Sequence, residues 1–159
     1  MIQLGNTNIY VGTRADSRLR NDPAWAVVNT AKTVHLEVKG WSNTPPRDHP
    51  DYLAFEDGQL LSFNWVDGPS KMYDWSGPKA FIRALDFIDK WYGRKNILIN
   101  CDLRQSRSPT IALLYLAKRM HLISEQSFVQ ARVDFQVLYS NYDPKGIAEY
   151  VDEHWNEIR

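Results

Sequence analysis

Cysteine is almost absent from this sequence, which has one, Cys101, among 159 residues. A lone cysteine forms no disulfide within the chain and cannot build a metal site with other cysteines. We therefore expect a reducing compartment and a cytoplasmic protein. The four histidines are scattered without the spacing of metal ligands, so no metal site is expected.

Long apolar runs and an excess of one charge are also missing. No run approaches the length that crosses a membrane, and the start has no basic region followed by an apolar one, so we expect neither membrane insertion nor a secretory signal. Lys plus Arg number 19 and Asp plus Glu number 19. Proteins that bind a nucleic-acid backbone usually carry a basic footprint, so the balance argues against nucleic acid as the main partner. A local basic site remains compatible with it.

The length indicates one domain, over residues 1–159. Hydrophobic residues make up 43% of the chain, which is enough for a core. Residues 43–50 contain three prolines and few apolar residues, and we interpret them as a surface loop rather than a linker.

Short apolar segments alternate with helical patterns. Predicted strands cover residues 8–12, 25–29, 33–38, 60–65 and 96–100. Predicted helices cover residues 81–92, 108–120 and 124–139, with a fourth from Pro144 and with Ser124 as the cap of the third. Strands that alternate with helices predict an α/β domain with a largely parallel sheet.

The most informative segment runs from residue 97 to residue 109. Cys101 stands at the end of a predicted strand and Arg107 at the start of a predicted helix, with five residues between them. A short loop of this kind can turn its backbone N–H groups inward as an anion nest, and the helix adds its positive N-terminal end. The segment therefore predicts a phosphate site.

The residue types at this loop suit phosphoryl transfer. A helix N-terminus and a nearby cation favour the thiolate form of cysteine, so Cys101 could attack phosphorus. The planar fork of Arg107 can hold two phosphate oxygens at once. The hydroxyl of Ser108 can donate to the sulfur when it leaves. Cys101 taken alone would be an inert buried thiol, but the strand, the helix start and Arg107 together favour a catalytic role.

These residues resemble a known family. Cys101 to Arg107 matches the C-x-x-x-x-x-R signature of protein tyrosine phosphatases, and residues 106–110 resemble the dual-specificity branch. Residues 8–12 resemble the opening strand of that family, and Asp67 matches its general-acid aspartate. The resemblance implies a central, mostly parallel but mixed sheet of about five strands flanked by helices. It also implies hydrolysis without a metal or an organic cofactor.

Two positions depart from the family pattern. The family usually has His before the nucleophile, where this chain has Asn100, which carries no charge but can donate a hydrogen bond. The family favours Gly three residues after the cysteine, where this chain has Arg104. Glycine is favoured where the backbone takes a conformation that other residues adopt with difficulty. We expect the two departures to affect rate and substrate range more than the chemistry itself.

Several roles have a competing interpretation. Asp67 is our candidate general acid, but Asp-Gly-Pro is also a turn sequence. Asp74 is its rival, or else caps the helix near residue 78, and Asp57 reads as a hairpin-turn residue. Arg104 is either a solvated loop charge or a rim cation that meets a second acidic group on the substrate. Ser106 and Ser108 could serve only as helix caps, and Ser108 has the better catalytic case.

The sequence thus predicts a phosphomonoester hydrolase, a dual-specificity-type protein phosphatase that acts on phosphorylated protein through a cysteinyl-phosphate. The expected substrate-binding residues are those of the loop, through their amides: Asp102, Leu103, Arg104, Gln105, Ser106 and Arg107. One alternative is a pseudophosphatase that only binds phosphate. Another is the same chemistry on an RNA 5′-phosphate or a phosphoinositide.

Overall fold

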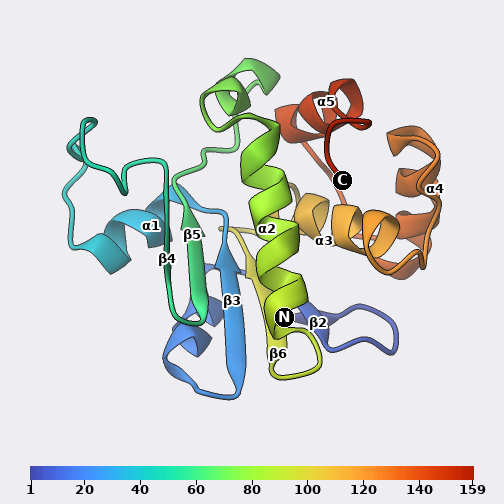
Figure 1. The fold of residues 1–159 in the computed structure, drawn as a ribbon, viewed down its shortest axis with the longest axis horizontal. Coiled ribbons are helices and arrows are strands. Elements are labelled where there is room, and N and C mark those ends of the chain that lie inside the picture. The colour runs from blue at the N-terminus through green and yellow to red at the C-terminus, as the bar shows by residue number, and fades with distance from the viewer.

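Six strands form one sheet, in the order β1-β2-β6-β3-β5-β4, in the computed structural model, which describes residues 1–159 (Figure 1). The strands are β1 (Ile2–Gln3), β2 (Ile9–Gly12), β3 (Trp25–Asn29), β4 (Ala54–Asp57), β5 (Leu60–Phe63) and β6 (Asn96–Asn100). The four inner strands run parallel, and the edge strands β1 and β4 are antiparallel to their neighbours. The expected mixed α/β sheet is confirmed, with six strands rather than about five.

Helices follow most of the strands. They are the 3₁₀ segments η1 (Arg14–Asn21) and η2 (Ser70–Trp75), and the α-helices α1 (Lys32–Lys39), α2 (Gly77–Trp91), α3 (Arg107–Lys118), α4 (Phe128–Leu138) and α5 (Gly146–Glu153). None of them combines the length and the apolar character that crossing a membrane requires.

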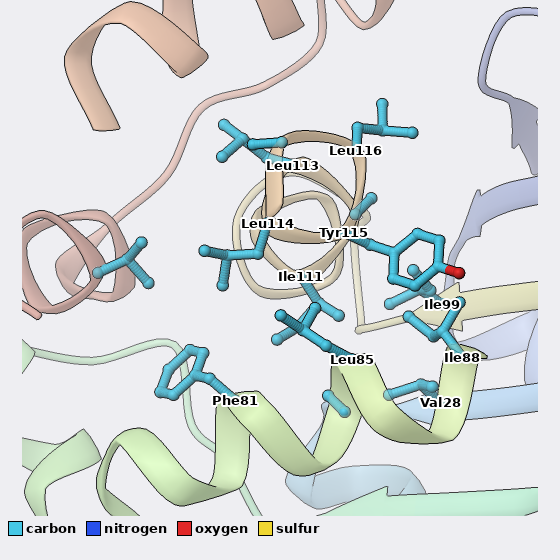
Figure 2. Close-up of a cluster of buried hydrophobic side chains, with 14 of the residues drawn as sticks. Val28, Phe81, Leu85, Ile88, Ile99, Ile111, Leu113, Leu114, Tyr115 and Leu116 are labelled. Atoms are coloured by element: carbon cyan, nitrogen blue, oxygen red, sulfur yellow. The ribbon is translucent and has the colours of Figure 1, made fainter. Parts of the chain in front are cut away.

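The two faces of the sheet have separate cores. One face packs against α2, α3, α4 and α5 in a cluster of 35 buried residues. Figure 2 shows part of it, where Leu85 of α2 lies beneath Ile111 of α3, while Leu113 and Leu116 leave α3 on the side away from α2. The other face has a smaller apolar cluster, to which η1 and α1 contribute partly buried side chains. Because strand residues alternate between faces, each parallel strand supplies both clusters.

The strand predicted at residues 33–38 is wrong, because this segment forms α1. Strict alternation would leave His35 exposed, but Val34, His35 and Leu36 are all buried. Gly40, in the left-handed conformation at φ 69°, ends the helix and donates its N–H to Glu37 and Leu36. That glycine was the C-cap signal in the sequence that distinguishes this helix from a strand.

Helix starts also differ slightly from the predictions. The cap of α4 is Ser127, whose hydroxyl accepts the N–H of Gln130 at 3.1 Å, rather than Ser124. Ser124 instead shapes the preceding turn, where its N–H donates to Asp134.

The position of β6 in the middle of the sheet decides where the loops meet. The C-terminal ends of β3, β5 and β6 lie side by side, because Asn29 pairs in register with both Ser62 and Asn100. In α/β folds ligands bind at this edge of the sheet. The loops that follow the three strands, which carry Thr30, Asp67 and Cys101, therefore converge there.

Candidate active site

The loop between β6 and α3 presents free backbone donors. The amide N–H groups of residues 102–107 donate to no acceptor within the chain, whereas the N–H of Cys101 donates to the carbonyl of Gly12 at 3.3 Å. Successive free amides in one loop, followed by a helix N-terminus, form an anion-binding nest. The predicted phosphate loop thus has the donors that its proposed role needs.

The opposite side of the loop is anchored to the C-terminal part of the chain. The carbonyl of Gln105 accepts the N–H of Asp143 at 2.9 Å, and the hydroxyl of Ser106 accepts the N–H of Lys145 at 2.9 Å. The hydroxyl of Tyr139 donates to the carbonyl of Arg104. Ser106 therefore holds the loop in place through its side chain, and does not cap α3 with it.

Cys101 lies at the floor of the loop, with 2% of its surface exposed. Its Sγ is 3.0 Å from Oγ of Ser108, which is fully buried in the first turn of α3. A hydroxyl at this distance can donate to a thiolate. The structure thus brings the predicted nucleophile and its predicted assistant into contact.

Arg107 is buried and held on three sides. Its Nη1 donates to the carbonyl of Trp65 at 2.7 Å and to that of Thr30 at 3.4 Å, and its Nη2 donates to Oδ2 of Asp102 at 3.0 Å. Its Nε has no partner within the chain although it is buried. A buried donor without an acceptor costs about 1–3 kcal/mol, so an anion in the loop would be stabilised by accepting from Nε.

Asp102 contributes its carboxylate as well as its amide. One oxygen accepts from Arg107 and the other accepts from the hydroxyl of Thr33, at the start of α1. Asp102 was expected to bind substrate through its amide alone, and no sequence signal indicated the ion pair. The next residue, Leu103, is 69% exposed, so its side chain lies on the outer rim.

Arg104 occupies the left-handed region, with φ 52°. This is the conformation that glycine adopts without cost, and it explains why the family favours Gly here. Its side chain is half-buried and makes no ion pair within the chain. The side chain is thus available to an anionic group at the rim of the loop, while the backbone holds a conformation that few residues other than glycine adopt.

Asp67 is exposed on the loop that follows β5. This loop is tied to the phosphate loop, because the carbonyl of Trp65 accepts from Arg107 and also from the N–H of Lys32 at 2.8 Å. Tyr73 donates its hydroxyl to the carbonyl of Val66 at 2.8 Å. The loop that carries Asp67 is thus held beside the arginine.

The electrostatics of Tyr73 indicate which residues lie near one another. Burial raises the pKa of Tyr73, the positive charge of Arg107 opposes this, and the negative charges of Asp67 and Cys101 add to it. One buried phenol therefore senses all three predicted catalytic groups.

Asp74 directly follows Tyr73 in η2, and its charge acts on α5. Burial raises the pKa of Tyr150, in α5, to about 12, and the charge of Asp74 adds to the rise. Asp74 is not the cap of α2 either, since that position belongs to Ser76. Asp57 ends β4, and the hairpin turn follows at Gly58 as the sequence indicated.

Sequence reasoning missed several residues around the site. Trp65 and Thr30 act through their carbonyls, which leave no mark in a sequence. Asn29 was missed too, although a polar residue that ends an apolar strand was a usable signal. No cluster of three or more His, Cys, Asp or Glu side chains is placed to hold a metal ion.

No protein-family model matches the chain, and no curated protein matches its sequence. Solved structures do match its fold. DUSP15 is 17% identical at a TM-score of 0.59, covering 98% of this chain and 86% of that one. Human DUSP28 is 13% identical at a TM-score of 0.60, covering 99% and 96%. The Cydia pomonella PTP-2 phosphatase is 19% identical at a TM-score of 0.57, covering 98% and 85%.

At these identities the likeness establishes the fold, over nearly the whole length of the chain. It agrees with the resemblance that the sequence carries at Cys101 and Arg107. The chain therefore has the fold that dual-specificity and protein tyrosine phosphatases share.

Proposed function

We propose that this chain is a phosphomonoester hydrolase of the dual-specificity type, which works through a covalent phosphate on Cys101. The observation that carries the proposal is the set of free donors around the buried thiol. The amides of residues 102–107 and Nε of Arg107 have no acceptor within the chain. Phosphoryl transfer depends mainly on positioning and on stabilising the equatorial oxygens, which is what such donors do.

In the first step the thiolate of Cys101 attacks phosphorus, so that an S–P bond forms and the P–O bond to the leaving group breaks. Arg107 and the loop amides bind the three equatorial oxygens. Asp67, protonated at the start, gives its proton to the leaving oxygen. The nearby Ser108 stays hydrogen-bonded to sulfur.

In the second step water attacks phosphorus and Asp67 takes its proton. The S–P bond breaks and inorganic phosphate leaves. Ser108 donates its hydroxyl to the departing thiolate, which makes sulfur a better leaving group. No step uses a metal or an organic cofactor.

The substrate that we propose is a phosphorylated protein, and we place the enzyme in the cytoplasm as a single catalytic domain. Two features support phosphoprotein: the balanced charge of the chain and the likeness of residues 106–110 to the dual-specificity branch. The experiment described next also tests the two alternative substrates, an RNA 5′-phosphate and a phosphoinositide.

The test measures phosphate release from a small aryl phosphate, phosphotyrosyl and phosphothreonyl peptides, a phosphoinositide and an RNA 5′-triphosphate. We expect hydrolysis of the aryl phosphate and the peptides, inhibition by vanadate, and full activity in the presence of EDTA. Cys101→Ser should abolish turnover and retain phosphate-analogue binding.

Wild-type protein that binds vanadate but hydrolyses none of these substrates would identify a pseudophosphatase. Activity that EDTA removes and a divalent metal restores would contradict the mechanism. Activity confined to the phosphoinositide or the RNA would keep the chemistry and overturn the phosphoprotein assignment.

A further inference from the structure

A row of buried polar residues crosses the sheet directly beneath the candidate site. Asn29 of β3 pairs in register with Ser62 of β5 on one side and Asn100 of β6 on the other. All three are fully buried on the face opposite the larger core, Asn29 and Asn100 as the last residues of their strands and Ser62 as the last but one. Asn100 is the position where the family usually has histidine, so this row occupies the place next to the nucleophile.

Hydrogen bonds join the row end to end. Nδ2 of Asn100 donates to Oδ1 of Asn29 at 3.0 Å, and Nδ2 of Asn29 donates to Oγ of Ser62 at 3.0 Å. Oγ of Ser62 is 2.7 Å from Nδ1 of His35, which is also fully buried. We call Asn100, Asn29, Ser62 and His35 the polar row.

The direction of the last bond follows from its neighbours. Nε2 of His35 lies 2.9 Å from the carbonyl oxygen of Asp51, and a carbonyl only accepts. Nε2 of the neutral ring therefore carries the hydrogen, and Nδ1 accepts the hydroxyl hydrogen of Ser62. Each bond of the row thus has a defined donor and acceptor.

The polar row also shapes the turn into α1. Asn29 accepts the N–H of Ala31 at 3.0 Å and donates to the carbonyl of Ala31 at 2.9 Å, so all four of its hydrogen-bonding positions are used. The adjacent Thr30 accepts from Arg107 through its carbonyl. It also donates to the carbonyl of Asn100 through its N–H at 2.9 Å and its hydroxyl at 2.8 Å.

We propose that His35, Ser62 and Asn29 are positioning residues that set the geometry of Cys101 and Arg107 by fixing Asn100 and the turn at residues 30–31. In this chain the row supplies the ordering of the loop that the family histidine provides elsewhere. The inference rests on the proposed function, because it concerns the same site. Of its three measurements, only the steady-state kinetics require that the protein turn over a substrate.

The test uses Ser62→Ala, His35→Phe and the double variant. His35→Phe keeps an aromatic ring beside Phe55, whose ring centroid lies 5.1 Å away, and removes both hydrogen bonds. His35→Asn is the conservative variant that can still accept from Ser62. Val27→Ala is the matched control, since Val27 is fully buried two residues before Asn29 on the same strand and lies outside the polar row.

Three quantities are measured: Tm, kcat and KM on an aryl phosphate, and the rate of Cys101 alkylation by iodoacetamide against pH. We expect Ser62→Ala and His35→Phe each to lower kcat about 10-fold, less than the ~10²-fold that a 1 Å misplacement can cost. Each should move the midpoint of the alkylation profile to higher pH, with a smaller change in KM. The double variant should match the worse single variant, because both changes break one chain of bonds.

Val27→Ala should lower Tm and leave kcat and the alkylation profile unchanged, and His35→Asn should recover most of the kcat. The proposal is overturned if the row variants lose Tm as the control does but keep wild-type kcat and alkylation. It is also overturned if the fold-reductions in kcat of the two single variants multiply in the double variant.

If the wild type hydrolyses no phosphate ester, the proposed function fails, while the alkylation profiles still decide this inference. If Ser62→Ala does not fold, the comparison of His35→Phe with His35→Asn decides it.

Discussion

Sγ of Cys101 and Oγ of Ser108 lie 3.0 Å apart, at opposite ends of the loop that joins β6 to α3. The contact brings together a strand end and a helix start, so the fold rather than a local turn maintains it. In the mechanism that we propose, a hydroxyl there stabilises negative charge on sulfur, most of all when sulfur leaves phosphorus.

We therefore predict that Ser108→Ala slows the second step more than the first. Stopped-flow measurement with an aryl phosphate should show a burst of the aryl product followed by a slower steady state, with kcat reduced about 10- to 100-fold, as loss of a hydrogen bond to a charged group implies. A matched control is Thr110→Ser, which keeps a hydroxyl one residue after Pro109 on the same helix. Loss of the burst itself, with slow first turnover, would contradict the assigned role.

Asp67 rather than Asp74 is expected to be the general acid, since Asp67 lies two residues after Trp65, whose carbonyl accepts from Arg107, whereas Asp74 lies in η2. Asp67→Asn should reduce kcat about 10²- to 10⁴-fold and remove one limb of the pH–rate profile. The loss should be largest for substrates with poor leaving groups, which most need a proton. Asp74→Asn is the control and should retain activity, and an exchange of the two results would show the assignment to be wrong.

Arg104→Gly should relieve the left-handed strain at φ 52°, so we expect a stability change within about 1 kcal/mol of wild type, as glycine also gains freedom in the unfolded chain. Turnover of a small aryl phosphate should stay near wild type. KM for a multiply anionic substrate should rise, by a factor that shrinks with added salt, because exposed charges are screened over about 10 Å at 0.1 M. An equal change for every substrate would favour a role in the loop backbone instead.

His35 should make the protein less stable in mild acid. Burial lowers the pKa of His35 below 6.5, with Lys39 also lowering it and the carbonyl and charge of Asp51 opposing. Below pH 6.5 the unfolded chain binds a proton that the folded chain excludes, so folding stability falls as pH falls, by at most about 1.4 kcal/mol per pH unit. Urea unfolding of wild type and His35→Phe between pH 7.5 and 5.5 should show a shallower slope for the variant. The exposed His121, changed to Gln, should leave the wild-type slope in place.

Peroxide should abolish the proposed phosphatase activity without forming a disulfide within the chain, because Cys101 is the sole cysteine. A thiolate oxidises to sulfenic acid, which can condense with a backbone nitrogen but here has no second thiol to meet. Intact-mass analysis after mild peroxide should show the gain of one oxygen, or the sulfenamide formed from it, at Cys101. Vanadate should protect the thiol if it binds the same loop. A thiol that vanadate leaves equally reactive would contradict this placement of the anion.

Local sequence patterns predicted the two central parallel strands correctly. The strands at residues 25–29 and 96–100 were predicted at the bounds that β3 and β6 have, because β-branched and aliphatic runs of that length fit a buried parallel strand. The prediction for residues 33–38 failed because Val34, Leu36 and Val38 at alternate positions also fit a short helix. The deciding residue, Gly40, lay outside the pattern.

The sequence by itself determined the residues on which the proposed chemistry depends: one cysteine, an arginine six residues later, and a strand and a helix on either side of the loop between them. Tertiary structure alone decided what surrounds that loop. Whether Arg107 meets the carbonyls of Trp65 and Thr30, and whether Asp102 pairs with it, depends on which strands are neighbours in the sheet. The same holds for the polar row, whose members Asn29, Ser62 and Asn100 are far apart in the chain and adjacent only through strand register. Register is set by the packing of whole faces, so no local stretch of sequence contains it.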